Sequence, residues 1–242
     1  MTVLCTPSWV TPDPRWITVL DTETTGLPDD PTAQVIEVAA AHLCIHPDRS
    51  ISIWDTWETL VCPVDDLTED HLEICRTYSK ITPDEILSAP APHEALALLC
   101  RKMRLYPGPI IAWNVAFDRR MVRRTLLGIC EEQYHNDRID PKYGAPTWLP
   151  VMGDPLPWGG CLAQHYTGVK GPVAGHFDAG GGEPKPRVAS LGLAMTLERI
   201  SRHGQAHRAL SDVLATAELA MKLWRGEVQP WGSHRSECDD RR

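Results

Sequence analysis

The 242-residue sequence lacks several features that would place it in a common class at once. No apolar run has the length of a membrane-spanning helix, and the first residues lack the basic-then-apolar pattern of a secretory signal. We therefore expect a cytoplasmic protein without a membrane partner. Positive charge is also scarce, because the formal net charge is −8, which argues against a broad basic surface for nucleic acid. Metal ions held in an acidic pocket could still supply the positive charge that phosphate needs.

The sequence also lacks any Cys-x-x-Cys pair, although it contains eight cysteines. Their scattered and mostly apolar contexts favour reduced thiols, and the even number leaves disulfides formally possible. Cys62, His71 and Cys75 could be considered as zinc ligands, but a fourth ligand at a suitable spacing is missing. The pattern therefore argues against a zinc-stabilised interaction domain.

The organisation of the chain is simple, because no internal repeat or long low-complexity tract is present. An apolar content of 43% allows one substantial core and requires no second domain. We expect an extended, proline-containing lead-in over residues 1–15, one domain over 16–226, and a polar tail over 227–242. Within the domain, residues 129–187 predict an irregular insertion with a mobile loop near 175–187, since glycine and proline are dense there.

Strand signals predict an α/β protein with a mixed sheet. Three successive β-rich segments, the second and third joined by the turn-forming residues 46–50, predict an antiparallel meander. A fourth short apolar strand comes later, and a fifth could lie near Trp148 to Met152 or near Cys161 to Ala163. The first four strands are expected over residues 16–20, 34–45, 51–61 and 109–113.

Helix signals alternate with the later strands. Thr82 to Glu85 has a cap residue, a proline at the first helical position and a glutamate that closes a capping box. Apolar residues at helical spacing predict further helices over residues 93–105, 114–127 and 191–200. The last helix is predicted from an apolar stripe at positions i, i+3, i+4 and i+7. The stripe consists of Leu210, Val213, Leu214, Ala217, Met221 and Trp224.

The first predicted strand runs directly into two carboxylates, Asp21 and Glu23. Side chains alternate along a strand, so these two point to the same face and Thr22 points to the other. Like charges that lie so close favour a cation, and hard oxygen ligands without Cys or His favour Mg²⁺ or Mn²⁺. A solvated turn is the alternative explanation for an isolated Asp-x-Glu.

Further acidic and basic residues could converge on the same place. Asp118 lies in the first turn of the helix that follows the fourth strand, and therefore at the carboxyl end of the sheet. Asp212 lies near the start of the last helix, off its apolar stripe, and His207 precedes that helix. An ordinary first-turn acid and a surface histidine are the alternatives for Asp212 and His207.

Together, these segments resemble the three exonuclease motifs of the DEDDh 3′-5′ exonucleases. The first motif is similar to the form found in the proofreading epsilon subunit of DNA polymerase III (DnaQ-like), and ribonuclease T and oligoribonuclease are further relatives. His207 and the Arg208 beside it favour the DEDDh branch over the DEDDy branch. The resemblance spans roughly residues 16–224 and rests on Asp21 to Leu27, Asn114 to Asp118, and His207 to Asp212.

The resemblance implies a ribonuclease H-like five-stranded sheet flanked by helices, and a two-metal hydrolysis of the terminal phosphodiester. Asp21, Glu23 and Asp212 would hold two Mg²⁺ or Mn²⁺ ions about 4 Å apart. Asp118 would contribute directly or through water. His207 would act as the general base, since an unperturbed histidine pKa of about 6.5 suits that role near neutral pH.

The family's substrate contacts map onto four residues of this sequence. Backbone groups of Thr22 and Thr24 would face the 3′-terminal nucleotide, and Leu27 would wedge against its base, with core packing as the alternative for Leu27. Asn114 could bind the substrate backbone or cap the following helix. The implied substrate is the 3′ end of DNA, with release of nucleoside monophosphates and a DNA polymerase as a possible partner. An exoribonuclease and a noncatalytic polymerase accessory module are the alternatives, and the oligomeric state stays open.

The sequence departs from the family pattern at two places. Position 113 is Trp where relatives often have His, which implies altered packing or base stacking. The aspartate-led strand between the second and third motifs is not obvious, and Asp154 to Leu156 is the nearest match. Arginines that follow Asp118 at helical spacing could contact phosphates or could form a solvated helix face. They are Arg119, Arg120, Arg123 and Arg124.

Overall fold

A computed structural model describes five stretches of the chain, which are residues 16–126, 156–171, 177–178, 185–186 and 188–230. The predicted lead-in over 1–15, the possible strand near Trp148 to Met152 and most of the loop predicted near 175–187 lie outside the described residues. The tail predicted over 227–242 is described only as far as Pro230. Val228 in that stretch is buried, so the tail begins beyond it.

A mixed five-stranded sheet forms the centre of the protein, in the order β3-β2-β1-β4-β5. The predicted meander is confirmed, because β1 pairs antiparallel with β2 and β2 pairs antiparallel with β3. β4 runs parallel to β1, and β5 runs parallel to β4. The strands span Trp16–Thr24 (β1), Val35–Ile45 (β2), Ile51–Leu60 (β3), Ile110–Ala112 (β4) and Trp158–Cys161 (β5).

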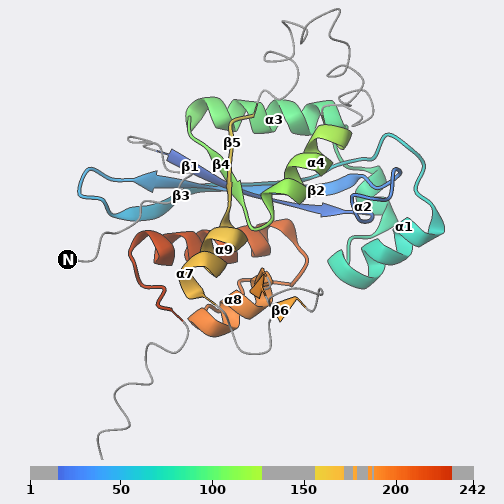
Figure 1. Ribbon diagram of the computed structural model, residues 1–242. Helices are drawn as coiled ribbons and strands as arrows, with labels where there is room; N and C mark the ends of the chain where they lie inside the picture. The colour runs from blue at the N-terminus through green and yellow to red at the C-terminus, as the bar shows by residue number, and fades with distance from the viewer. Residues whose placement is uncertain (1–15, 127–155, 172–176, 179–184, 187, 231–242) are drawn as a thin grey trace, which may run out of the picture.

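Helices cover both faces of this sheet, as Figure 1 shows. One face carries α3 (Pro92–Leu105) and α4 (Val115–Thr125), and the other carries α7 (Leu162–Lys170), α8 (Leu191–Glu198) and α9 (Ala209–Trp224). Each layer has its own hydrophobic core. Ten of the eleven residues of β2 are buried for this reason, and the strand reads as an almost continuous apolar run.

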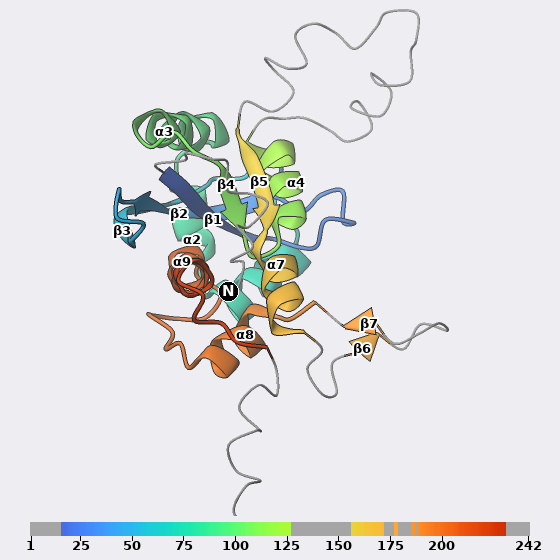
Figure 2. The same ribbon diagram turned by 60° about the vertical axis from the view of Figure 1, so that its left-hand side comes forward.

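Short helices lie at the end of the sheet where β1 finishes. They are α1 (Glu69–Ile74), a π-helix (Cys75–Ser79) that continues it, and α2 (Pro83–Leu87). The predicted capping box is confirmed, because the Thr82 hydroxyl accepts from the Glu85 amide and the Glu85 carboxylate accepts from the Thr82 amide. A two-stranded ribbon, β6 (Phe177–Asp178) and β7 (Lys185–Pro186), lies apart from the main sheet in Figure 2.

The region between residues 129 and 187 corrects two sequence predictions. It was predicted to be irregular, but its second half contains β5 and α7. The fifth strand is Trp158–Cys161, so it lies near the predicted position at Cys161 to Ala163 but begins earlier, and the helix already begins at Leu162. Two glycines within a four-residue strand gave no β signal, because glycine normally weakens a strand.

The last helix also differs from its predicted stripe. Leu210, Leu214, Met221 and Trp224 are only partly buried, whereas small residues such as Ala215 and Ala220 are fully buried. α9 packs against β1, β2 and β3 on one side and against α7 and α8 on the other. Because α9 is packed on two sides, its neighbours must come close to the helix axis, which small side chains permit. A single stripe of large residues therefore does not describe this helix.

No described helix is long and apolar enough to cross a membrane. The cysteines within the described stretches are free thiols, in agreement with the reduced state expected from their spacing. His71, one of the residues considered for zinc, has both ring nitrogens engaged: Nδ1 accepts from the Thr68 amide and Nε2 faces Asp30 and Thr32.

Candidate active site

The carboxyl end of β1 brings two acidic side chains to the α9 side of the sheet. Asp21 and Glu23 alternate with Leu20 and Thr22, as predicted from the strand period. Glu23 lies directly opposite Glu37 of β2, and the β1–β2 register shifts immediately after it. This irregularity ends regular pairing at the point where the carboxylates gather.

Asp118 is held from the other side of the sheet by Thr22. It lies in the first turn of α4 and is only 3% exposed. The Thr22 amide donates to Asp118 Oδ1 at 3.0 Å, and the Thr22 hydroxyl donates to the same oxygen at 2.9 Å. These bonds join β1 to α4 and fix the Asp118 carboxylate beside the end of β1. A contact of the Thr22 backbone with substrate stays a prediction.

The start of α9 completes the cluster. Glu23, His207 and Asp212 each offer one ligand atom, and these atoms all lie within 4.8 Å of one another. Among the described residues, this is the one group of acidic, histidine or cysteine side chains that meets such a criterion. His207 is exposed and its backbone has φ of +58°, a left-handed conformation that few non-glycine residues adopt.

Two arginines neutralise part of this acidic group. Arg202 forms an ion pair with Asp212, and Arg208 forms an ion pair with Glu37. Glu37, Arg202 and Arg208 were not predicted as site residues. Glu37 carried a usable signal, since it is a single acid inside an apolar strand and a buried acid needs a partner.

Burial and mutual repulsion shift the carboxyl groups toward their protonated forms. Burial, then the charges of Asp118, Glu23 and Glu37, raises the pKa of Asp21 well above its ordinary value. Burial, reinforced by Glu37 and Asp118, raises the pKa of Glu23 to about 8. Burial also raises the pKa of Asp118 to about 7, although the hydrogen bonds from Thr22 oppose the shift.

This donor set fits a divalent cation. Carboxylates that burial and repulsion make costly to ionise are stabilised by a cation of high charge, and the carboxylate oxygens of this set suit Mg²⁺ or Mn²⁺. The structure therefore brings together the five residues predicted to be catalytic. One ligand atom each of Glu23, His207 and Asp212 lies within 4.8 Å of the other two. Asp21 and Asp118 lie close to this group, since, in addition to burial, the charge of Asp118 raises the pKa of Asp21 and of Glu23.

The structure also places the residues predicted to bind substrate. Thr24 donates its hydroxyl hydrogen bond to the Gly26 carbonyl at 2.7 Å, which shapes the turn after β1. Leu27 on that turn is 67% exposed, so the core-packing alternative is wrong. Asn114 precedes α4 but its side chain makes no capping hydrogen bond, so the capping alternative is wrong as well. Contacts of Thr24, Leu27 and Asn114 with substrate stay predictions.

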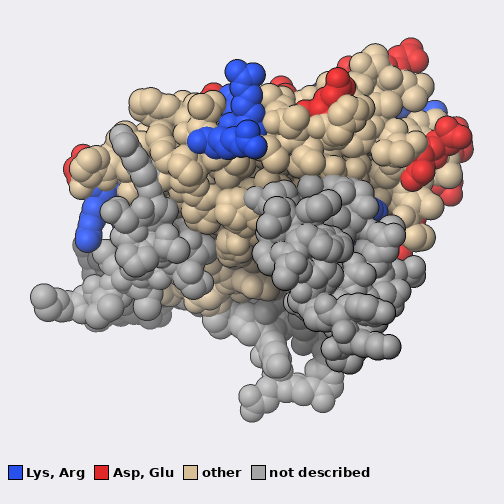
Figure 3. Space-filling view, turned by 90° about the horizontal axis from the view of Figure 1, so that it is seen from above, with Lys and Arg blue, Asp and Glu red and all other residues tan. Residues whose placement is uncertain are grey.

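The arginines of α4 do not act as one group. Arg124 is a structural residue, since Nη1 donates to the Asp30 carbonyl at 2.6 Å and Nη2 donates to the Pro28 carbonyl at 2.8 Å. It thereby fixes the turn that carries Leu27, whereas Arg119 is exposed. In Figure 3, many of the visible Lys and Arg atoms of the described residues lie in one group, and further ones appear separately toward the edges of the view.

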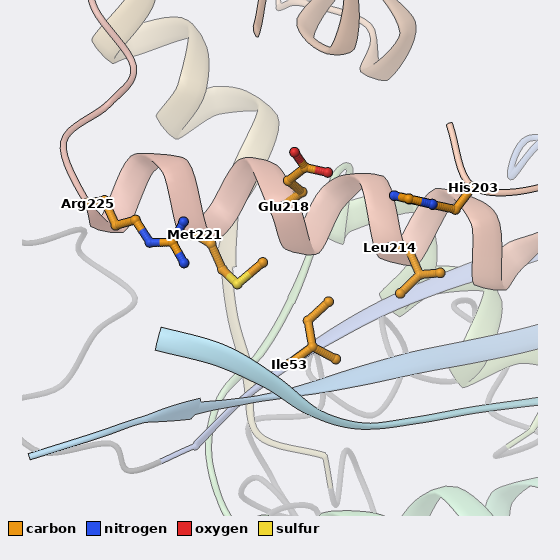
Figure 4. A pocket seen from close by; sticks show the side chains of 6 residues that line it. All are labelled: Ile53, His203, Leu214, Glu218, Met221 and Arg225. Carbon is orange, nitrogen blue, oxygen red and sulfur yellow. The ribbon is translucent and has the colours of Figure 1, made fainter. Parts of the chain in front are cut away.

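A separate hollow lies between α9 and β3, shown in Figure 4. It has a volume of about 460 Å³ and contains none of the predicted catalytic residues. The lining residues are Ile53, His203, Leu214, Glu218, Met221 and Arg225.

Comparison with known proteins adds a likeness in fold. No family model and no curated protein matches this sequence. A full-length 3′-exonuclease superposes with a TM-score of 0.59 at 17% identity, over 89% of this chain but only 62% of its own length. The nuclease domain of 3′hExo, a DEDDh family member bound to rAMP, superposes with a TM-score of 0.57 at 17% identity, over 91% of this chain and 96% of the domain.

A third solved structure extends the same likeness. Exonuclease I of E. coli, in complex with a dA16 oligonucleotide, gives a TM-score of 0.51 at 21% identity, over 88% of this chain and 41% of its own. At such identities the likeness shows a shared fold. The ribonuclease H-like arrangement of a mixed five-stranded sheet flanked by helices is therefore confirmed for this protein.

Proposed function

We propose that this protein is a metal-dependent 3′-5′ exonuclease of the DEDDh type, which hydrolyses the terminal phosphodiester of a nucleic acid. The observation that carries the proposal is the convergence of Glu23, His207 and Asp212 at the carboxyl end of β1, with Asp21 and Asp118 beside them. This end of the sheet is where ligands bind in open α/β folds. The shared fold of several exonucleases supports the proposal.

Three of the acidic residues would bind the cations, and the fourth is fixed in place by hydrogen bonds. Asp21, Glu23 and Asp212 would hold two Mg²⁺ or Mn²⁺ ions, and Asp118, fixed by Thr22, would complete the set. When bound, such ions supply Lewis acidity and charge that stabilise the attacking and leaving oxygens of a phosphodiester. Asp212 also forms an ion pair with Arg202, so a cation at this site would compete with the Arg202 guanidinium for the Asp212 carboxylate.

We assign the general base to His207. It is exposed at the mouth of the acidic group, its ring lies 5.7 Å from the ring of Tyr78, and its ligand nitrogen is within 4.8 Å of carboxylate oxygens of Glu23 and Asp212. A histidine there can take the proton from an attacking water molecule and pass it to solvent.

The substrate we propose is the 3′ end of DNA, single-stranded or frayed, with release of nucleoside monophosphates. Exonuclease I was solved with a deoxyadenosine oligonucleotide, which supports DNA. The 3′hExo nuclease domain, 96% of which superposes on this chain, was solved with rAMP. This favours a 3′-5′ exoribonuclease as the second candidate. A DNA polymerase partner, and hence a proofreading role, belongs to the first candidate alone.

Digestion of matched oligonucleotides tests both candidates. We expect 5′-labelled DNA to give a ladder of products shortened from the 3′ end with Mg²⁺ or Mn²⁺, and no ladder with EDTA. Comparing the rates at which the DNA oligomer and an RNA oligomer of the same sequence are shortened decides between the two candidates. If neither oligomer is shortened with any divalent metal, the proposal is wrong.

Two variants of α9 make the test specific. Asp212→Asn removes a predicted ligand and should abolish the ladder. Glu218→Gln makes the same chemical change about two turns along the helix, away from the cluster, and should leave the ladder intact. A noncatalytic accessory module would instead bind the oligomer without cleavage and would behave the same in both variants.

A further inference from the structure

Glu37 is a buried acid for which the proposed chemistry has no use. Its side chain is 1% exposed and lies directly opposite Glu23 in the β1–β2 ladder. Two like charges facing each other across a strand pair are destabilising, and Glu37 does raise the pKa of Glu23. A carboxylate in this place needs a dedicated partner, and α9 supplies it.

The partner is Arg208 together with the backbone at the start of α9. Arg208 Nε lies 3.1 Å from Glu37 Oε1 and 3.2 Å from Oε2, and Arg208 Nη2 donates to Oε1 at 2.7 Å. The Ala209 amide donates to Oε2 at 2.9 Å. Both carboxylate oxygens are therefore taken up by residues 208 and 209. A charged donor in such a two-pronged contact gives a strong and well-oriented bond.

These bonds anchor the two residues that directly follow His207. The left-handed backbone of His207 is unfavourable for a non-glycine residue, so the surrounding structure must impose it. Before His207, the Gln205 side-chain amide donates to the Ser79 carbonyl at 3.4 Å. Tyr78 contacts the His207 ring from the same π-helix.

From this geometry we propose that Glu37 and Arg208 act as a positioning pair. The pair holds the His207 backbone in its left-handed conformation, so that the imidazole stays beside Glu23 and Asp212. This role rests on the proposed exonuclease function, in which His207 is the general base. Neither Glu37 nor Arg208 touches the reacting atoms, and both act through His207.

The surroundings of Arg208 favour a fixed charge. Besides Glu37, the charges of Glu58 on β3 and Glu85 on α2 act on it, and all three raise its pKa further. Arg208 directly precedes α9, so its charge links the start of that helix to acidic residues on β2, β3 and α2. Because Arg208 neutralises Glu37, the site does not gain an additional unpaired carboxylate beside Glu23.

Steady-state kinetics of Arg208→Met provide the first test. The substitution removes the guanidinium but keeps a long side chain. We expect kcat to fall by roughly 10- to 100-fold, because small displacements of a catalytic group have effects of this size, while KM and Mn²⁺ affinity change little. Glu37→Gln should show the same pattern, and Arg208→Lys should recover part of kcat.

Arg225→Met is the matched control. Arg225 lies at the opposite end of α9 and donates to the Ile51 carbonyl of β3 at 3.2 Å, so it also joins the helix to the sheet. If the pair only fastens α9 to the sheet, then Arg208→Met and Arg225→Met should lower activity alike in proportion to lost stability. Equal effects would overturn the proposal.

A double-mutant cycle with His207→Ala separates positioning from a direct effect on the metals. Without the imidazole there is nothing left to position, so adding Arg208→Met should lower the residual rate by less than about 2-fold. Additive losses, or a loss of Mn²⁺ affinity that accounts for the lower rate, would show that the pair serves the metal site itself and would contradict the proposal.

Amide hydrogen exchange tests the pair without any activity assay. Exchange at residues 207–209 should become faster in Arg208→Met and stay unchanged in Arg225→Met. Unchanged exchange in both variants would refute the positioning role even if the enzyme is active. If the wild type has no exonuclease activity but exchange responds as expected, the proposed function fails while the structural pair stands.

Discussion

Two groups of buried polar residues lie against the same strands, and they differ in how charge is balanced. On the α9 face, Asp21 and Glu23 lie beside other carboxylates, and burial raises the pKa of each. On the α3 face, further back along β1, the Thr18 hydroxyl meets His42 Nδ1 at 2.9 Å, and burial lowers the pKa of His42 to about 4. The first group collects like charges, whereas the second keeps its histidine neutral.

The partners of His42 show what a structural polar group looks like. Lys102 and Asp55 form an ion pair at 2.7 Å beside it, and the Tyr106 ring lies 4.4 Å from the imidazole. Opposite charges are thus paired within the group. At the end of β1, charges of one sign exceed their partners, which destabilises the fold but creates affinity for cations. The difference separates a group that stabilises the fold from one that we propose serves chemistry.

The largest expected effect comes from neutralising one acid of the α9-face group. Asp21→Asn removes a proposed metal ligand and with it several kcal/mol of charge stabilisation, so exonuclease activity should fall by about 10³-fold or more. In EDTA the same variant should unfold at a higher temperature than the wild type, since a costly buried charge is gone. Activity assays and thermal unfolding check both. A variant that is inactive but also less stable without metal would break the comparison.

The His42 group should respond to pH. An unfolded His42 has a pKa near 6.5 and the folded one about 4, so its contribution is complete above pH 6.5 and is lost as the pH falls toward 4. The loss amounts to about 3 kcal/mol at most. Asp55 on β3 raises the pKa of His42 and Lys102 on α3 lowers it, and both act less strongly than burial.

Urea unfolding between pH 7.5 and pH 4 measures this contribution, with His42→Gln as the reference. The wild type should lose more stability than the variant, which cannot titrate at position 42. The raised pKa values of the acidic group act with the opposite sign, because they lose stability as pH rises, and they cancel in the difference between the two proteins. Parallel pH curves would contradict the prediction.

The same contrast explains which residues could be predicted from the sequence. The Asp21 and Glu23 pair, Asp118, His207 and Asp212 were predicted because each lies at a recognisable boundary between a strand or loop and a helix. Glu37 and Arg208 were missed because their ion pair joins positions 171 residues apart, and no local pattern reports such a partner. Arg202 was missed for the related reason that its only signal is its contact with Asp212.

The fold shows a similar division. The meander and the helices α3 and α9 were predicted because hydrophobic period, caps and turn residues agree there. β5 and α7 were missed because glycine-containing strands and weakly amphipathic helices depend on their neighbours for stability. The short α1 and its π-helix were not predicted either, since their caps and Arg76 to Glu69 contact are seen only once the chain is folded.

Metal should stabilise the acidic group alone. At a Mn²⁺ concentration of about 100 times its Kd, the free energy of unfolding should rise by about 2.7 kcal/mol per site. Asp21→Asn should lose most of this gain, whereas His42→Gln should retain it in full. Thermal unfolding with and without Mn²⁺ provides the measurement. Equal stabilisation of both variants would place the ion elsewhere in the molecule.

The smallest expected effect is the loss of the ion pair beside His42. Lys102→Met leaves Asp55 without its partner, and because both side chains are still about a quarter exposed, the cost should be at most about 1 kcal/mol. Arg76→Met removes a more exposed pair with Glu69 and should cost less still. Both variants should retain full nuclease activity, because neither touches the end of β1. An effect of Lys102→Met on activity that exceeds its effect on stability would show that the two buried groups are coupled through the sheet.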